Sequence, residues 1–333
     1  MRWRRIFVAI GILALGAGYF IHRGATHAGH GASASDPAGQ DAVTPTERTA
    51  PNVEEAPRIA RTRSTNRIAS SSPAPLPPPG TPLKAAMAEL SARADAGDSE
   101  AASRLARDLN KCTYVARMKQ LLPQIVPFAL DEDDKKLTAK ELSQREKSLG
   151  LYQRELDRIH DNEALCAGLD RADFDALTPA LLRAAQLGDA RATDCYLSSG
   201  LTGMQGLLDH PEWLADFKRN AMPLAHTAIE RGDWVAVGIL EHAYGGFFSD
   251  FMSQITGPDL AQRYRYLSLQ RLGARGDFIA KLDRQIAAIV PSLTPAQVSD
   301  GDSWAQDTYT RYFNGSSSNE LSNGTNVCWS DEN

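Results

Sequence analysis

The 333-residue sequence predicts an all-α fold in which antiparallel helical hairpins stack, either as a superhelix or as a compact repeat-derived bundle. Two observations carry this prediction. The motif Gly-Asp-x-x-Ala occurs five times in the helical body. Three copies begin at residues 188, 232 and 276, a constant spacing of 44, and one begins at residue 97. The fifth, at Gly301, lies only 25 residues after the previous copy, so we treat it as out of phase. Apolar residues also recur at intervals of three and four around the motif, as in amphipathic helices.

Each of the four remaining Gly-Asp pairs predicts a tight turn between two helices. The four pairs are Gly97-Asp98, Gly188-Asp189, Gly232-Asp233 and Gly276-Asp277. Glycine adopts the left-handed conformation that ends a helix, and aspartate accepts hydrogen bonds from the N–H groups that open the next one. The carboxylate also suits the positive end of the helix dipole. We therefore interpret these aspartates as helix caps rather than as catalytic acids.

The N-terminal region predicts a tether to a membrane. Residues 1–23 contain three early arginines and an apolar run over residues 6–21, which is typical of a signal anchor or of a cleaved signal peptide. Residues 24–82 are rich in Ala, Ser and Pro without an apolar period, so we expect a disordered linker. This organisation predicts a single-pass protein of a bacterial inner membrane with its body in the periplasm. Cleavage would instead leave a soluble periplasmic or secreted protein.

The charge distribution argues against one class of partner. Residues 1–82 hold nine arginines, no lysine and five acidic residues, a net charge of +4. Because the whole chain has a net charge of −5, residues 83–333 carry −9. A body with this charge is not expected to bind nucleic acid without sequence preference, since that binding needs a basic face.

The helical repeat domain is predicted over residues 83–313, with an insertion at 113–165. Pro123 and Pro127 predict a break in the chain inside this insertion. A long charged helix is then expected from Thr138 to His160. Its predicted apolar stripe is Leu142, Leu149, Tyr152 and Leu156. The hairpins resume at Leu177, and residues 314–333 are expected to form an irregular tail.

Four cysteines, all in the body, predict disulfides in an oxidising compartment. Three pairings are possible. We favour Cys112 with Cys166, because this bond would clamp the two ends of the insertion. Cys195 would then pair with Cys328 and tie the tail to the second hairpin. The sequence has no Cys-x-x-Cys pair, so a zinc site is not predicted.

The body resembles the Sel1-like branch of tetratricopeptide-type helical repeats. The resemblance rests on Ala184-Ala185-x-x-Gly188-Asp189-x-x-Ala192, and a near copy lies around Gly97. It covers roughly residues 83–112 and 177–290. The resemblance implies a right-handed superhelix of stacked helix pairs that serves as a scaffold for protein–protein interactions.

A membrane-tethered interaction scaffold is therefore the first functional hypothesis, and its protein partner is not identified by the sequence. The alternatives are a cell-envelope enzyme acting on peptidoglycan and a small-ligand binding protein. Candidate acids and bases for an enzyme are Glu163, Asp170, Glu230, His210, His226 and His242. Aromatic residues that would line a ligand pocket are Tyr196, Trp213, Trp234 and Tyr264. No catalytic motif, cofactor-binding motif or metal-ligand motif is found, so neither a cofactor nor a metal is predicted.

Overall fold

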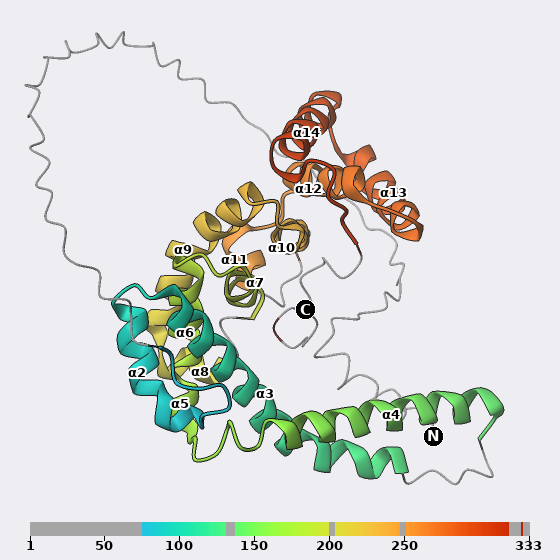
Figure 1. Ribbon diagram of the computed structural model, residues 1–333. Coiled ribbons are helices and arrows are strands. Elements are labelled where there is room, and N and C mark those ends of the chain that lie inside the picture. The colour runs from blue at the N-terminus through green and yellow to red at the C-terminus, as the bar shows by residue number, and fades with distance from the viewer. Residues whose placement is uncertain (1–74, 131–136, 200–203, 247–250, 320–327, 329–333) are drawn as a thin grey trace, which may run out of the picture. The chain divides into compact units, whose positions relative to one another are not determined.

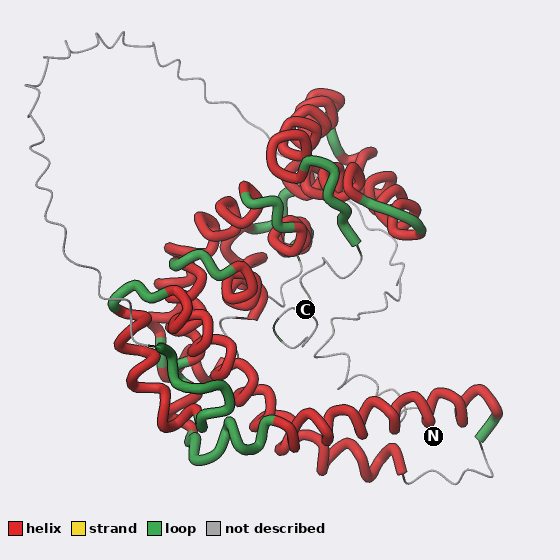
Figure 2. Tube along the Cα trace, in the orientation of Figure 1, coloured by secondary structure: helices red, strands yellow, loops and turns green. Residues whose placement is uncertain are grey.

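The computed structural model describes residues 75–130, 137–199, 204–246, 251–319 and Cys328. Within these ranges the regular elements are helices and no strand is formed, which confirms the all-α fold (Figure 2). No helix in the described ranges is long and apolar enough to cross a membrane. The expected anchor at residues 6–21 and nearly all of the expected linker lie outside the described residues.

The helices follow the order expected for a series of hairpins. They are α2 (Leu83–Asp95), α3 (Ser99–Leu130), α4 (Ala139–Asp161), α5 (Arg171–Phe174), α6 (Leu177–Gln186), α7 (Ala190–Ser199), α8 (Met204–Asp209), α9 (Pro211–Glu230), α10 (Trp234–Tyr244), α11 (Phe251–Thr256), α12 (Leu260–Gly273), α13 (Asp277–Ile289) and α14 (Pro295–Thr308). A 3₁₀ turn follows α13 at Val290–Ser292, and a π-helical turn follows α14 at Tyr309–Phe313.

The hairpins α2–α3, α6–α7 and α9–α10 pack against one another in chain order (Figure 1). Helix α3 packs on α6, α7 packs on α9, and α10 packs on α12, which also contacts α13 and α14. One buried apolar cluster runs through these helices from Leu83 to Phe313. Each hairpin thus buries the face that its neighbour leaves open, as expected for stacked repeats.

Two arginines also connect neighbouring hairpins through carbonyl groups at helix ends. Arg183 on α6 donates to the carbonyls of Ala94 and Asp95, both at 3.0 Å, at the end of α2. Arg231, just after α9, donates at 3.3 Å to the carbonyl of Gly188. A cation at a helix C-terminus satisfies carbonyls that lack an intrahelical partner, so these contacts stabilise the stack.

The first three Gly-Asp pairs form the turns that join the two helices within each of these hairpins. Gly97, Gly188 and Gly232 have φ angles of +96°, +98° and +80°. The N–H of each following aspartate donates to the carbonyl five residues earlier, at 3.0, 3.0 and 3.1 Å. Each aspartate side chain also accepts from the N–H of the alanine three residues later, at 3.1, 2.7 and 3.4 Å. The pair therefore ends one helix and caps the next.

The cap expected at the fourth pair is absent. Gly276, with a φ of +57°, occupies the N-cap position of α13. Asp277 is the first residue of the helix, and no side chain caps the helix N-terminus. Helix α12 has already ended at Gly273, whose carbonyl accepts from the N–H of Ser318 at 3.0 Å. Ala274 is extended and pairs with Ser318. This pairing lies between the end of α12 and the motif. Gly276 therefore takes the N-cap position that aspartate has in the other three turns, and Asp277 becomes the first residue of α13.

The break expected at Pro123 and Pro127 is also absent, because both prolines lie inside the 32-residue helix α3. Their side chains are exposed, whereas Leu122 and Ile125 are buried against α4, where Tyr152 belongs to the same cluster. Packing along the α3–α4 pair therefore compensates for the backbone hydrogen bonds that proline removes. The insertion is the continuation of α3 together with α4 (Figure 1).

Helix α4 begins within one residue of its predicted start, but its apolar stripe is only partly correct. Tyr152 is buried and Leu149 packs against the same cluster. Leu142 and Leu156 are instead 39% and 47% exposed, and Ile159 is buried. The stripe that contacts α3 is therefore rotated slightly from the one that leucine positions alone indicate.

The structure confirms both expected disulfides, Cys112–Cys166 and Cys195–Cys328. The first bond joins α3 to the segment after α4 and closes the base of the α3–α4 hairpin. The second joins α7 to the C-terminal region of the chain.

We expect Asp189→Ala to lower the free energy of unfolding by about 1 kcal/mol, because the N–H of Ala192 loses its side-chain acceptor. Urea unfolding at neutral pH measures this loss. Asp189→Asn keeps an acceptor oxygen and should recover most of the stability. An equal loss in both variants would contradict the capping role.

Candidate functional site: a cationic cavity beside α3

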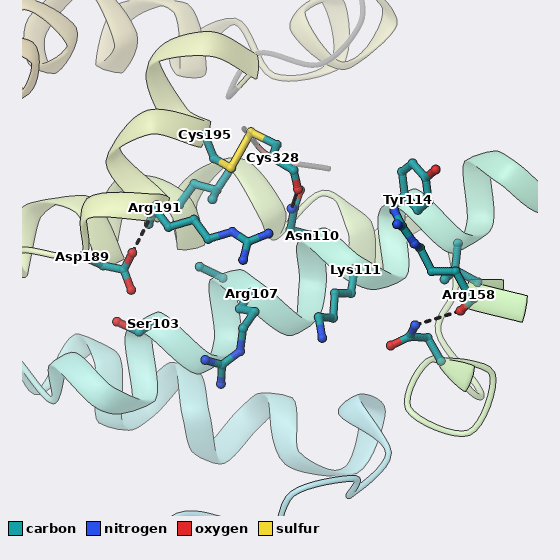
Figure 3. A pocket seen from close by; sticks show the side chains of 15 residues that line it. Ser103, Arg107, Asn110, Lys111, Tyr114, Arg158, Asp189, Arg191, Cys195 and Cys328 are labelled. Carbon is teal, nitrogen blue, oxygen red and sulfur yellow. Dashed lines mark hydrogen bonds between the residues drawn. A yellow bond between two sulfur atoms is a disulfide. The ribbon is translucent and has the colours of Figure 1, made fainter. Parts of the chain in front are cut away.

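A cavity of ≈ 230 Å³ lies between α3, the α6–α7 hairpin and the end of α4 (Figure 3). Four cationic side chains line it: Arg107, Lys111, Arg158 and Arg191. The carboxylate among the lining residues is Asp189, whose oxygen already accepts the capping hydrogen bond. The lining side chains therefore carry a net charge of +3.

Helix α3 supplies one wall of the cavity because of the spacing of its polar residues. Ser103, Arg107, Asn110, Lys111 and Tyr114 recur at intervals of three and four, which places them on one helical face. The opposite wall comes from α7, whose Arg191 side chain extends toward Asn110 in Figure 3. The cationic residues thus come from segments that are far apart in the sequence.

The local charge differs in sign from that of the whole body. Residues 83–333 carry −9, whereas the cavity lining carries +3. Arg107 has a carboxylate at 3.8 Å, on Asp108, yet its side chain remains 53% exposed. A concave surface with one sign of charge focuses the electrostatic potential, so this cavity attracts anions at short range.

Arg158 is held against an aromatic ring at one end of the cavity. Its guanidinium carbon lies 5.7 Å from the ring centroid of Tyr114, within the range of a cation–π contact. The Tyr114 hydroxyl donates to the Glu155 carboxylate. Burial, followed by the hydrogen bond to Glu155, raises the pKa of Tyr114 well above its usual value. Tyr114 therefore stays neutral, with its hydroxyl hydrogen donated to Glu155 and its ring in contact with Arg158.

The second disulfide forms part of the wall. Cys195 and Cys328 both line the cavity, and they are 2% and 4% exposed. The Asn110 side-chain amide donates to the backbone carbonyl of Cys328 (Figure 3). This contact places Cys328 over the middle of the cationic face of α3.

The chemistry of the lining favours binding over catalysis. The described residues that line the cavity include no histidine, and both cysteines are in a disulfide. Arginine and lysine side chains bind carboxylates and phosphates through charge-assisted hydrogen bonds. The arrangement can therefore hold an anionic group, but it does not pair a nucleophile with a base.

The candidate acids from the sequence are not brought together at the cavity. Glu163 forms an ion pair with Lys119 at 2.6 Å. Asp170 caps α5, accepting from the N–H of Ala172 at 2.9 Å. Glu230 is exposed at the end of α9. These carboxylates therefore pair with a lysine, cap a helix or face solvent, as structural and solvated acids do.

The candidate histidines are also dispersed. The His210 ring stacks on Trp213, with centroids 4.2 Å apart, and contacts the Glu212 carboxylate at 3.0 Å. His226 is exposed on α9, and His242 lies on α10. None of the three lines the cavity.

The aromatic residues considered for a ligand pocket belong to the interior. Tyr196, Trp234 and Tyr264 are buried, and Trp213 packs against the main apolar cluster. Sequence reasoning missed the four cationic residues that line the cavity. The sequence signal was weak: the basic residues Arg107 and Lys111 are four positions apart on α3, with Asn110 and Tyr114 on the same face. Nothing in the sequence places Arg158 or Arg191 beside them.

A pair of carboxyl groups lies between α7 and α10. Asp194 is 6% exposed, and one of its oxygens has no hydrogen-bond partner. Its side chain is hydrogen-bonded to that of Asp233, the cap of α10. Burial and then the charge of Asp233 raise the pKa of Asp194 to about 9, although Arg231 opposes the shift. Asp194 is therefore protonated at neutral pH and donates to Asp233.

Comparison with known proteins finds no family model, no curated protein and no solved structure that matches this chain.

Proposed function

We propose that this chain is a membrane-tethered helical-repeat scaffold of the bacterial periplasm that binds an acidic segment of a partner protein. The observation that carries the proposal is the cavity with a net charge of +3 in a body with a net charge of −9. The two disulfides support an oxidising compartment, and the stacked hairpins support a scaffold.

The size and shape of the cavity favour a docking segment over a free metabolite. Its ≈ 230 Å³ is smaller than the range of about 300–1,000 Å³ that is common for small-molecule sites. The face of α3 from Ser103 to Val115 extends for about 18 Å, from a rise of about 1.5 Å per residue. Arg107 and Lys111 lie about 6 Å apart along this face, and Arg158 lies beside Tyr114 further along it. Separated cations of this kind match successive carboxylates of a peptide better than one compact anion.

The test uses the full-length chain in detergent and a fluorescent peptide with six consecutive glutamates. We expect Arg107→Glu combined with Lys111→Glu to weaken binding about tenfold or more, because two attractive charges become repulsive. Fluorescence anisotropy measures the dissociation constant. The control is Lys147→Glu combined with Arg284→Glu, which changes the net charge equally at exposed positions outside the cavity.

The salt dependence of the affinity distinguishes binding at the cavity from an effect of the net charge of the body. If the cavity governs binding, affinity falls as salt screens the attraction. If the net negative charge of the body governs the encounter, added salt raises affinity instead. Equal effects of the cavity variant and its control, or affinity that rises with salt, would refute the proposed docking site.

A further inference from the structure

The segment that leads into α2 belongs to the folded body. Residues 75–82 form this segment, which we call the strap. Leu76 packs against the main apolar cluster. The carbonyl of Pro78 accepts from the N–H of Thr81 at 3.2 Å and from its hydroxyl at 2.7 Å, in a turn where Gly80 has a φ of +82°. This turn fixes the direction of the carbonyl groups in the strap.

Arg104 on α3 holds the strap. Its guanidinium donates to the carbonyls of Pro77 and Pro78, to the latter at 2.9 Å. Proline has a carbonyl but no N–H, so a run of prolines offers acceptors that a guanidinium can satisfy. Arg104 is 7% exposed, and its Nε–H donates to the Asp108 carboxylate at 3.3 Å. The strap thus covers the arginine and fixes it beside Asp108.

Asp108 connects this contact to the cationic cavity. It is 8% exposed, and its second oxygen lies 3.8 Å from the Nε of Arg107. Arg107 lines the cavity, and its side chain is 53% exposed. A buried carboxylate needs a cationic or hydrogen-bonding partner. Two arginines can therefore neutralise Asp108, Arg104 beneath the strap and Arg107 in the cavity.

We propose that Arg104 is a positioning residue that determines how freely Arg107 can bind an anion. While the strap is docked, Arg104 neutralises Asp108, and Arg107 is available to a ligand in the cavity. Release of the strap exposes Arg104 to water, which weakens its pair with Asp108. Asp108 then draws Arg107 toward itself and away from the ligand.

This exchange of partners couples the strap to the cavity. Its effect on ligand affinity rests on the proposed function, whereas the exchange itself does not. Coupling between two sites is reciprocal, so an anion that holds Arg107 should in turn favour the docked strap. A partner that lifts the strap from Arg104 would lower the affinity of the cavity for its acidic ligand.

A strap variant tests the exchange and leaves both arginines in place. It combines Leu76→Ser, Pro77→Gly and Pro78→Gly, which removes the apolar anchor and frees the backbone. Arg104 is not substituted, because its loss would leave a buried carboxylate without its nearer cation and destabilise the fold. The matched control adds Asp108→Asn to the same three changes. Asparagine keeps an acceptor oxygen for Arg104 but has no charge that attracts a second arginine.

The first measurement uses no ligand. The full-length chain in detergent is treated with phenylglyoxal, which modifies accessible guanidinium groups, and the modified arginines are identified by peptide mapping. We expect Arg104 to be protected in the wild type and reactive in the strap variant. The reactivity of Arg107 should fall about two- to fivefold in the strap variant, as for a weak exposed ion pair, and return when Asp108→Asn is added. The exposed Arg284 provides the reference rate.

The second measurement is the affinity for the hexaglutamate peptide, by fluorescence anisotropy. The strap variant should bind the peptide about two- to fivefold more weakly than the wild type. In chains that carry Asp108→Asn, the same strap changes should leave the affinity unchanged. A merely structural role of the strap would instead lower the affinity in both backgrounds.

The two measurements distinguish the two proposals. The exchange is refuted if Arg104 stays protected in the strap variant, or if it becomes reactive while Arg107 is unaffected. Equal weakening of peptide binding with and without Asp108→Asn would refute the coupling to the cavity. A shift in Arg107 reactivity without peptide binding to the wild type would refute the proposed function and retain the exchange. Binding that is lost in Arg107→Glu combined with Lys111→Glu, with no shift in reactivity, would retain the function and refute the inference.

Discussion

Asp194→Asn should stabilise the protein at neutral pH by about 2–4 kcal/mol. In the folded protein, burial and Asp233 raise the pKa of Asp194 to about 9. In the unfolded chain the same carboxyl ionises near its model value of 3.8. Folding at pH 7 must therefore return a proton to Asp194. Asparagine is neutral at every pH, and its amide can donate to Asp233 as the protonated acid does.

The sign of the pH dependence follows from these two pKa values. Well below pH 3.8, Asp194 is protonated in both states and does not change the free energy of unfolding. As pH rises from 4 toward 9, only the unfolded chain ionises at this position, so stability is lost progressively. The advantage of Asp194→Asn should therefore be small at pH 4 and grow with pH.

Urea unfolding at several pH values between 4 and 8.5 measures this difference. Asp307→Asn, at an exposed position, serves as the control and should follow the wild type throughout. The electrostatic interpretation fails if the curves of wild type and Asp194→Asn run parallel.

Trp234→Ala should lower the free energy of unfolding by about 3–5 kcal/mol, through lost apolar burial and a residual cavity. The indole is 8% exposed, and its centroid lies 4.0 Å from that of Phe313. Its N–H donates to the Ser316 hydroxyl at 3.0 Å. Gly273 leaves the space that the ring occupies, since a Cβ there would lie 2.4 Å from the indole. One side chain thus joins the third hairpin to α12 and to the segment after α14.

The urea midpoint and slope provide the measurement for Trp234→Ala. Trp234→Phe retains much of the apolar area and loses only the hydrogen bond and part of the ring, so about half of the loss should be recovered. A loss of less than about 1.5 kcal/mol in Trp234→Ala would show that the surrounding helices close the gap.

The parts of the fold that could be predicted depend on local chemistry. The turns at Gly97, Gly188 and Gly232 need only a left-handed residue followed by a hydrogen-bond acceptor, and both are visible in the sequence. The continuity of α3 through Pro123 could not be predicted in this way. It depends on burial of the opposite face against α4, and local preference does not report that packing.

The cavity was harder to predict than the turns. On a single helix, Arg107 and Lys111 have the appearance of an ordinary solvated face. Their significance depends on Arg158 and Arg191, which approach only after α4 and α7 have packed beside α3. The disulfide between Cys195 and Cys328 could be favoured from the sequence, but its position in the wall of this cavity could not.

The two disulfides also differ in the time at which their partners become available during synthesis. Cys112 and Cys166 are 54 residues apart, whereas Cys195 precedes Cys328 by 133 residues. At about 5–20 residues per second, Cys195 waits about 7–27 s for its partner to be made. Early closure of Cys112 with Cys166 removes the two thiols that could capture Cys195 during this interval. The order of the cysteines along the chain therefore favours native pairing.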